Sequence, residues 1–245
     1  MTDMPSLQDI ADEVSRSRDR EPGYRRIAVA GEFESGKSSV INALVGKVAV
    51  PCNPGLPGRP VVKLKHSLHH MVSVETATGE SLEVRSFGTL TTRRDIAVCD
   101  IRTPLPGLHR TEIVEIPHRP GTGIDPEDFA MLAAADMIVW VTIGSQAWRL
   151  SERTTVAGLP PGCREKSVLA VSRADHLRDA GDWDKIEARL QNEASPFFSE
   201  MVFIQASMQN LWDCRQDDDT WIRTGGPTLA SIADDLLNAP KGEAA

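Results

Sequence analysis

The sequence predicts an α/β fold in which helices cover both faces of a mostly parallel sheet and an antiparallel hairpin forms one edge. Short apolar runs, typical of buried strands, alternate with amphipathic helical segments through most of the chain. A glycine-rich phosphate-binding pattern lies between the first such strand and the first helix. With 245 residues, the chain is long enough to bury one substantial core.

The first predicted strand, residues 26–30, leads directly into the pattern G-x-x-x-x-G-K-[ST], written here as Gly31-Glu32-Phe33-Glu34-Ser35-Gly36-Lys37-Ser38. A helix is predicted over residues 39–45, and Gly46 stands at the usual stop position. Strand, glycine loop and helix is the context in which this pattern binds nucleotide phosphates. A glycine turn followed by an exposed lysine is the alternative, and the flanking strand and helix disfavour it.

The chemistry of this loop assigns a role to each residue type. Gly31 and Gly36 let the backbone curl closely enough for its amides to face a phosphate. The start of the helix adds partial positive charge. Lys37 is placed to reach the β and γ phosphates, and the hydroxyl of Ser38 to bind Mg²⁺.

The remaining elements follow from periodicity and from helix and turn signals. Residues 71–76 and 81–86 alternate around Thr78-Gly79 and predict the hairpin. The proline- and glycine-rich residues 50–60 predict a loop, and Asp125 followed by Pro126 predicts the start of a helix. Further strands are predicted over residues 113–116, 137–143, 167–171 and 201–206, and further helices over 6–18, 151–157, 184–194 and 228–237.

Composition limits the classes of function. With 27 Lys and Arg against 35 Asp and Glu, the net charge is −8, and no basic stripe suggests nucleic-acid binding. The four cysteines show no C-x-x-C spacing, so we expect reduced thiols in a cytoplasmic protein. The longest apolar run, around residues 137–143, is too short to span a bilayer. The helix at residues 6–18 either packs on the main domain or contacts a partner or a membrane surface.

Residues 31–33 and 35–44 together resemble bacterial dynamin-like GTPases, whose loop commonly reads G-E-F-S-A-G-K-S-S-L-I-N-A-L. The resemblance implies a Ras-like P-loop NTPase domain over residues 25–238, preceded by an amphipathic segment at 1–24 and followed by a disordered tail at 239–245. Ser172-Arg173-Ala174-Asp175 is similar to the family's [NT]-K-x-D motif, in which the aspartate reads guanine. Gln205-Ala206-Ser207 is similar to its Ser-Ala motif.

This resemblance implies GTP or GDP and Mg²⁺ as ligands. The nucleotide would lie against Gly31, Glu32, Glu34, Ser35, Gly36, Lys37, Ser38, Ser39, Arg173, Asp175 and Ser207. Lys37, Ser38 and Glu115 would form the catalytic set, with Ser38 and Glu115 near the metal. A homodimer across the nucleotide face, a further protein partner and peripheral membrane contact are compatible with the family.

Three departures from the family affect the parts that position water and metal. The switch loop at residues 56–60 contains no threonine or serine. The family's D-T-P-G is replaced by Glu115-Ile116-Pro117-His118, and Glu34 puts a negative charge beside the phosphates. Such changes slow hydrolysis more than binding, because phosphoryl transfer depends on positioning and charge.

Two functions therefore stay open: a slow GTPase, and a binding or scaffold protein that holds nucleotide without hydrolysis. An ATP-dependent enzyme is disfavoured by Asp175, since adenine lacks the two donors that this carboxylate would accept from. Arg59, Arg119 and Arg149 could offset phosphate charge and His118 could orient water, but structural or solvated roles are favoured for all four.

Overall fold

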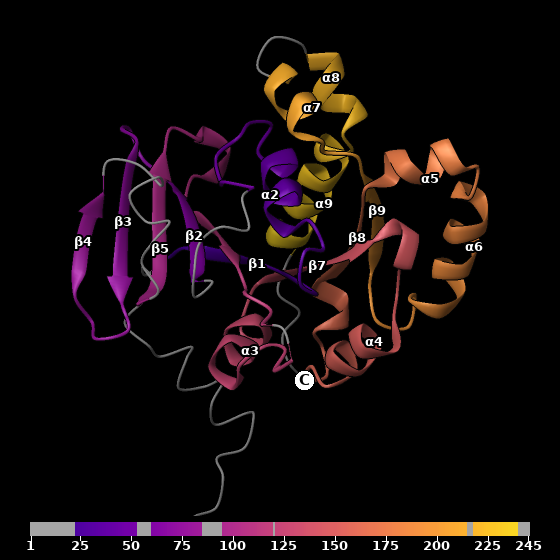
Figure 1. Cartoon of the computed structure of the whole chain (residues 1–245), viewed down its shortest axis with the longest axis horizontal. Coiled ribbons are helices and arrows are strands. Elements are labelled where there is room, and N and C mark those ends of the chain that lie inside the picture. The colour runs from indigo at the N-terminus through magenta and orange to yellow at the C-terminus, as the bar shows by residue number, and fades with distance from the viewer. Residues whose placement is uncertain (1–22, 53–59, 85–94, 120, 215–217, 240–245) are drawn as a thin grey trace, which may run out of the picture.

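The computed structural model describes residues 23–52, 60–84, 95–119, 121–214 and 218–239. The helix predicted at residues 6–18, the tail, and most of the switch loop at 56–60 lie outside this described part. Within it, one sheet runs through the whole molecule, and helices lie on both sides of it (Figure 1).

The sheet has nine strands in the order β4-β3-β5-β2-β6-β1-β7-β8-β9. The strands are β1 (Arg25–Gly31), β2 (Val61–His66), β3 (Met71–Thr76), β4 (Ser81–Val84), β5 (Ile96–Thr103), β6 (Thr111–Glu115), β7 (Met137–Ile143), β8 (Ser167–Ser172) and β9 (Glu200–Ile204). Five consecutive strands of the sheet, β6, β1, β7, β8 and β9, pair in parallel. β2 runs antiparallel to β6 and parallel to β5, while β3 pairs antiparallel with β5 and with β4.

The helices are α2 (Lys37–Leu44), α3 (Pro126–Ala133), α4 (Leu150–Ala157), α5 (Ala174–Ala180), α6 (Trp183–Glu193), α7 (Met208–Asp213), α8 (Asp218–Arg223) and α9 (Gly226–Asn238). Two apolar clusters show which face each helix covers. One contains α2 and α9, and the other contains side chains of α3, α4, α5 and α6. Both faces of the sheet are therefore buried, and the predicted α/β fold with an antiparallel edge hairpin is confirmed.

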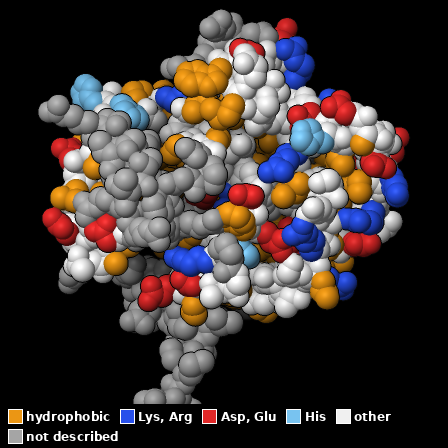
Figure 2. Space-filling model, viewed as in Figure 1, with side chains coloured by type: hydrophobic (Ala, Val, Ile, Leu, Met, Phe, Trp, Pro, Cys, Tyr) orange, Lys and Arg blue, Asp and Glu red, His pale blue; other side chains and the backbone are white. Residues whose placement is uncertain are grey.

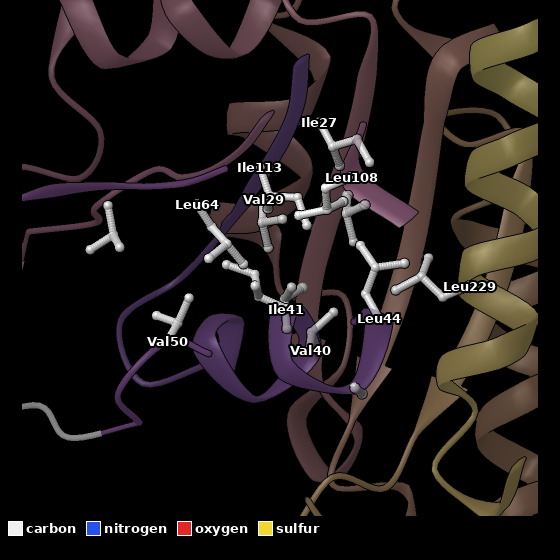
Figure 3. Close-up of a cluster of buried hydrophobic side chains, with 14 of the residues drawn as sticks. Ile27, Val29, Val40, Ile41, Leu44, Val50, Leu64, Leu108, Ile113 and Leu229 are labelled. Carbon is white, nitrogen blue, oxygen red and sulfur yellow. The ribbon is translucent and has the colours of Figure 1, made fainter. Parts of the chain in front are cut away.

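The central strand β1 serves both clusters. Ile27 and Val29 face α2, while Ala28 and Ala30 face the opposite side. Figure 3 shows the first cluster, with Leu44 of α2 beside Leu229 of α9. Burial on both faces explains why the strand reads as a continuous apolar run and not as an alternating one.

Most predicted elements are confirmed within one or two residues, but two strands, β2 and β5, and three helices, α5, α7 and α8, were not anticipated. Lys63 and Lys65 interrupt the apolar pattern of β2, and yet both side chains are buried. Asp100 interrupts β5 in the same way. Lys65 has carboxylates beside it on the sheet, because its Nζ lies 3.4 Å from Glu112 Oε2 and 3.9 Å from Asp100 Oδ2.

Membrane-spanning segments, the state of the cysteines and the surface charge were also predicted from the sequence. In the described part of the chain, no helix is both long and apolar enough to cross a bilayer. All four cysteines have free thiols. On the face in Figure 2, the described Lys and Arg side chains are interspersed with Asp and Glu, so they form no continuous basic surface there.

A buried ion cluster joins three neighbouring strands. The guanidinium of Arg26 on β1 lies 2.6 Å from Glu112 Oε1 on β6, and Lys65 Nζ on β2 lies 3.4 Å from Glu112 Oε2. Glu112 is fully buried. Removing one partner of such a group leaves the remaining charges buried without compensation.

We therefore expect Glu112→Ala to lower the free energy of unfolding by about 3–5 kcal/mol, because Arg26 stays buried and loses its counter-charge, while Lys65 keeps only Asp100 at 3.9 Å. Urea unfolding measures the change. Glu193→Ala is the control, because Glu193 and its partner Arg189 are both exposed and their charged atoms lie 4.0 Å apart. This substitution should lower the free energy of unfolding by about 0.5 kcal/mol or less. Equal effects of the two substitutions would contradict this assignment.

Candidate functional site

A cavity of about 500 Å³ opens where β1, β6 and β8 end. Its lining comes from segments far apart in the sequence, with residues from 33–40, 50–52, 60–62, 115–118, 172–176 and 204–208. The carboxyl ends of parallel strands form the usual ligand-binding edge in α/β sheets. The sequence motifs thus meet at one place, although residues 53–59 next to it are not described.

The phosphate loop leaves β1 in very close contact with β7. At Gly31, with φ +148°, an added Cβ would lie 2.2 Å from the carbonyl oxygen of Val141, so no side chain fits. Gly36 caps α2 with φ +94°, and Glu34 also has positive φ, at +57°. The loop is therefore a tight backbone arc held in conformations that L-residues seldom adopt.

The ammonium of Lys37 lies inside this arc. Its Nζ donates to the carbonyl oxygens of Gly31 at 3.2 Å and Glu32 at 2.9 Å, and the side chain is buried. Both acceptors are neutral. A buried ammonium bonded to neutral carbonyls beside an open cavity is poised to attract an anion.

Ser38 and Glu115 meet at the same end of the cavity. The hydroxyl of Ser38 donates to Glu115 Oε2 at 2.8 Å. Burial raises the pKa of Glu115, while Lys37 and the Ser38 hydrogen bond oppose that rise. The structure thus brings together the three residues predicted as the catalytic set.

These two oxygen donors fit a magnesium ion. A hydroxyl and a carboxylate are hard ligands of the kind that Mg²⁺ takes in small number, alongside water and substrate phosphates. A buried carboxylate whose charged form is disfavoured would gain stabilisation from a divalent cation. The predicted metal pair is therefore compatible with the geometry.

The predicted base-reading residues line the same cavity. Asp175 lies in the first turn of α5, and its side chain is 37% exposed. Arg173 reaches back to the phosphate loop, where Nη2 donates to the carbonyl of Glu34 at 3.1 Å. Ser207 lines the cavity, but its hydroxyl accepts from the amide of Asn210 and so caps α7.

Ser172 has a definite partner that the sequence did not reveal. Its hydroxyl lies 2.6 Å from the carbonyl oxygen of Ser35 and 3.1 Å from that of Thr142. Its single proton is thus shared between the phosphate loop and β7. The sequence had placed this residue only at the start of the motif similar to [NT]-K-x-D.

Some predicted residues do not line the cavity. Gly31 and Glu32 shape the loop, but the Glu32 carboxylate turns toward α4, where it pairs with Arg149 at 2.9 Å. Arg119 pairs with Asp125 at 2.6 Å and Asp128 at 3.0 Å. Arg119 and Arg149 therefore have the structural roles that the sequence favoured.

Cys52 and Met208 line the cavity and were missed. The Ser39 hydroxyl and the Asn42 amide both contact Cys52 Sγ, at 3.6 and 3.2 Å. Asn42 Oδ1 also accepts from the amides of Ala49 and Val50. Asn42 therefore folds the segment after α2 back to the site, a tertiary arrangement without a local sequence signal.

Comparison with known proteins agrees with the geometry. The Dynamin family matches residues 27–100. Dynamin-like protein 2 of Campylobacter jejuni subsp. jejuni serotype O:23/36 (strain 81-176) is 21% identical over 190 residues, which cover 73% of this chain and 30% of that protein.

Two solved structures described as an oligomerised bacterial dynamin pair, in a mechanism for long-range sensing and tethering of membranes, share the fold. They cover 96% of this chain with TM-scores of 0.66 and 0.67 at 13% identity. The chain spans 30% of the curated relative and about half of each of these structures. Residues 27–100 are therefore similar to the Dynamin family, and the chain shares the fold of the two dynamin structures.

Proposed function

We propose that residues 25–238 form a guanine-nucleotide-binding domain that hydrolyses GTP slowly. One observation carries the proposal: a single cavity is lined by Lys37, Ser38 and Glu115, which lie close together, and also by Asp175. The first three suit a magnesium-bound polyphosphate, and the fourth suits a base with adjacent N–H donors. A nucleoside di- or triphosphate combines these two chemistries.

The phosphate end of the site supplies positive charge and amide donors. Lys37 would exchange the carbonyls of Gly31 and Glu32 for phosphate oxygens, and the first amides of α2 would donate to the same anion. Ser38 and Glu115 would hold Mg²⁺, which when bound neutralises charge that develops on the phosphates. Glutamate is one methylene longer than the family's aspartate, and the Glu115 carboxylate still accepts a hydrogen bond directly from the Ser38 hydroxyl.

The base end supports guanine over adenine. The Asp175 carboxylate can accept from guanine N1 and its exocyclic amine, whereas adenine offers no such pair. Arg173 is exposed and lies over the mouth of the cavity, bonded to Glu34. Its planar guanidinium and apolar stem can cover one face of the base.

Slow hydrolysis follows from the residues around Glu115. His118 lines the cavity at the position where the family's D-T-P-G has the glycine that senses the γ-phosphate, and Pro117 matches the family's proline. His118 lacks the backbone freedom of glycine. The parts that bind phosphate are therefore better preserved than the parts that position water.

The same observation supports a second candidate, a protein that binds guanine nucleotide without hydrolysing it. Such a protein lacks closure around the γ-phosphate, so its affinities for GDP and GTP would be similar. A preference for GTP above about tenfold, which corresponds to 1.4 kcal/mol, would count against this candidate.

We also propose a homodimer across the nucleotide face, by analogy with the oligomerised dynamin pair. A further protein partner and peripheral membrane contact are part of the same analogy. The four free thiols are compatible with a reducing compartment such as the cytoplasm.

With GTP and Mg²⁺, we expect slow phosphate release that Lys37→Ala lowers by about 100-fold or to background, since this ammonium is the charge nearest the phosphates. Single-turnover phosphate release measures it. Lys185→Ala, on the exposed surface of α6, is the matched control and should behave as wild type.

Wild-type release no faster than that of Lys37→Ala would contradict hydrolysis. If GTP still binds under those conditions, the binding-only candidate is the correct one.

We expect Mg²⁺ to raise the affinity for GTP, and we expect this increase to be about tenfold smaller in Ser38→Ala. The variant loses one oxygen ligand of the metal and the hydrogen bond that orients Glu115. The measurement compares GTP dissociation constants in Mg²⁺ and in EDTA. Ser231→Ala, an exposed serine of α9, is the control. An unchanged ratio in Ser38→Ala would exclude this serine as a metal ligand.

A further inference from the structure

A buried carboxylate outside the cavity has no part in the function proposed above. Glu152, in the first turn of α4, is 2% exposed. It accepts from Trp140 Nε1 at 3.2 Å, Thr142 Oγ1 at 3.0 Å and the amide of Arg149 at 2.8 Å. Burial raises its pKa against the effect of these three donors. Burial disfavours the charged form of this carboxylate, and three hydrogen bonds compensate for it. Such a fully bonded group fixes the positions of its partners.

One path leads from Glu152 to the end of the phosphate loop. The side chain of Thr142 donates to Glu152, and the Thr142 carbonyl lies 3.1 Å from the hydroxyl of Ser172. That hydroxyl lies 2.6 Å from the carbonyl oxygen of Ser35. All of these side chains are buried.

A second path leads from Glu152 to the start of the same loop. Glu152 binds the amide of Arg149, whose Nη1 donates to Glu32 Oε2 at 2.9 Å. Ser151 donates to the other oxygen of that carboxylate. Glu32 in turn presents its backbone carbonyl to Lys37 Nζ.

The corner between β7 and α4 is strained, and Glu152 helps to hold it. Trp148 has φ +60°, although its side chain is buried. Its amide donates to Thr142 Oγ1, and its ring packs on Phe197 and Phe198 at 5.3 and 5.2 Å. A residue keeps such a backbone conformation only where its surroundings over-determine it.

We propose that Glu152 is a positioning residue that holds both ends of the phosphate loop, through Arg149 and Glu32 at the start and through Thr142 and Ser172 at the end. The loop itself contains Glu34 at positive φ, so it needs support from outside to keep its amides convergent. The expected effect on nucleotide affinity rests on the proposed function. The effect of Glu152 on the rigidity of the loop does not, because it can be measured in the nucleotide-free protein.

The test combines Glu152→Gln with amide hydrogen exchange of residues 32–37 in the nucleotide-free protein. The glutamine side chain has only one acceptor oxygen. Its NH₂ group would face one of the three donors and could not accept a hydrogen bond from it. We expect exchange in this loop to become about tenfold faster, since the hydrogen bonds from Thr142 and from the Arg149 amide lose the charge of their acceptor. Exchange in β3 and β5, far from α4, should not change. Glu193→Gln, an exposed carboxylate of α6, is the matched control.

Two further measurements separate positioning from general destabilisation. In Glu152→Gln, GDP should bind about tenfold more weakly at a temperature where the fold is intact, because the loop's amides no longer converge. Trp140→Phe, added to Glu152→Gln, removes the donor that faces the new amide and should restore part of the affinity. Glu152→Gln and Glu32→Gln together should cost less than the sum of their separate effects, because they interrupt one path.

Unchanged exchange of residues 32–37 in a folded Glu152→Gln protein would overturn the proposal, and so would strictly additive effects with Glu32→Gln. If Glu152→Gln does not fold, the variants Arg149→Ala and Glu32→Gln test the second path and must speed exchange of the loop. Failure of the wild-type protein to bind GDP would overturn the proposed function and leave the exchange result to decide on the loop.

Discussion

At Gly31 the chain leaves β1 so close to β7 that an added Cβ would lie 2.2 Å from the carbonyl oxygen of Val141. The rest of the site depends on this approach. It directs the loop into an arc around Lys37, and the arc ends at Gly36, where α2 begins. Because α2 packs on the central strands and beside α9, the arc is fixed to the most buried part of the fold.

The same arrangement explains why one end of the cavity is built for charge. Lys37, Ser38 and Glu115 come from α2 and β6, which both pack against β1. The pKa of the Glu115 carboxyl is raised by burial, and Lys37 offsets only part of that effect. A cation next to this carboxylate and an anion next to this ammonium would each relieve an unfavourable burial. Magnesium with a polyphosphate supplies both.

Much of this could be predicted from the sequence because the information is local. Gly31, Gly36 and Gly46 mark a strand, a loop and a helix end by backbone requirements alone. Strands such as β7 and β8 are buried on both faces, so their apolar runs were unambiguous.

The rest could not be predicted because it depends on long-range pairing. Lys63 and Lys65 interrupt the apolar run of β2, and no strand was predicted there, whereas the structure buries them on the sheet, with Lys65 beside the fully buried Glu112. The contacts of Ser172 with Ser35 and of Arg149 with Glu32 join residues more than a hundred positions apart. No periodicity or cap signal records such contacts. The roles given to the site residues remain proposals.

The central claim is that the cavity is a guanine-nucleotide site. Calorimetric titration of the nucleotide-free protein with GDP and with ADP, in one Mg²⁺ buffer, tests it most directly. The account predicts one GDP per chain, bound at least about tenfold more tightly than ADP, because only guanine can donate two hydrogen bonds to Asp175. Equal affinities for the two nucleotides, or no binding of either, would contradict it.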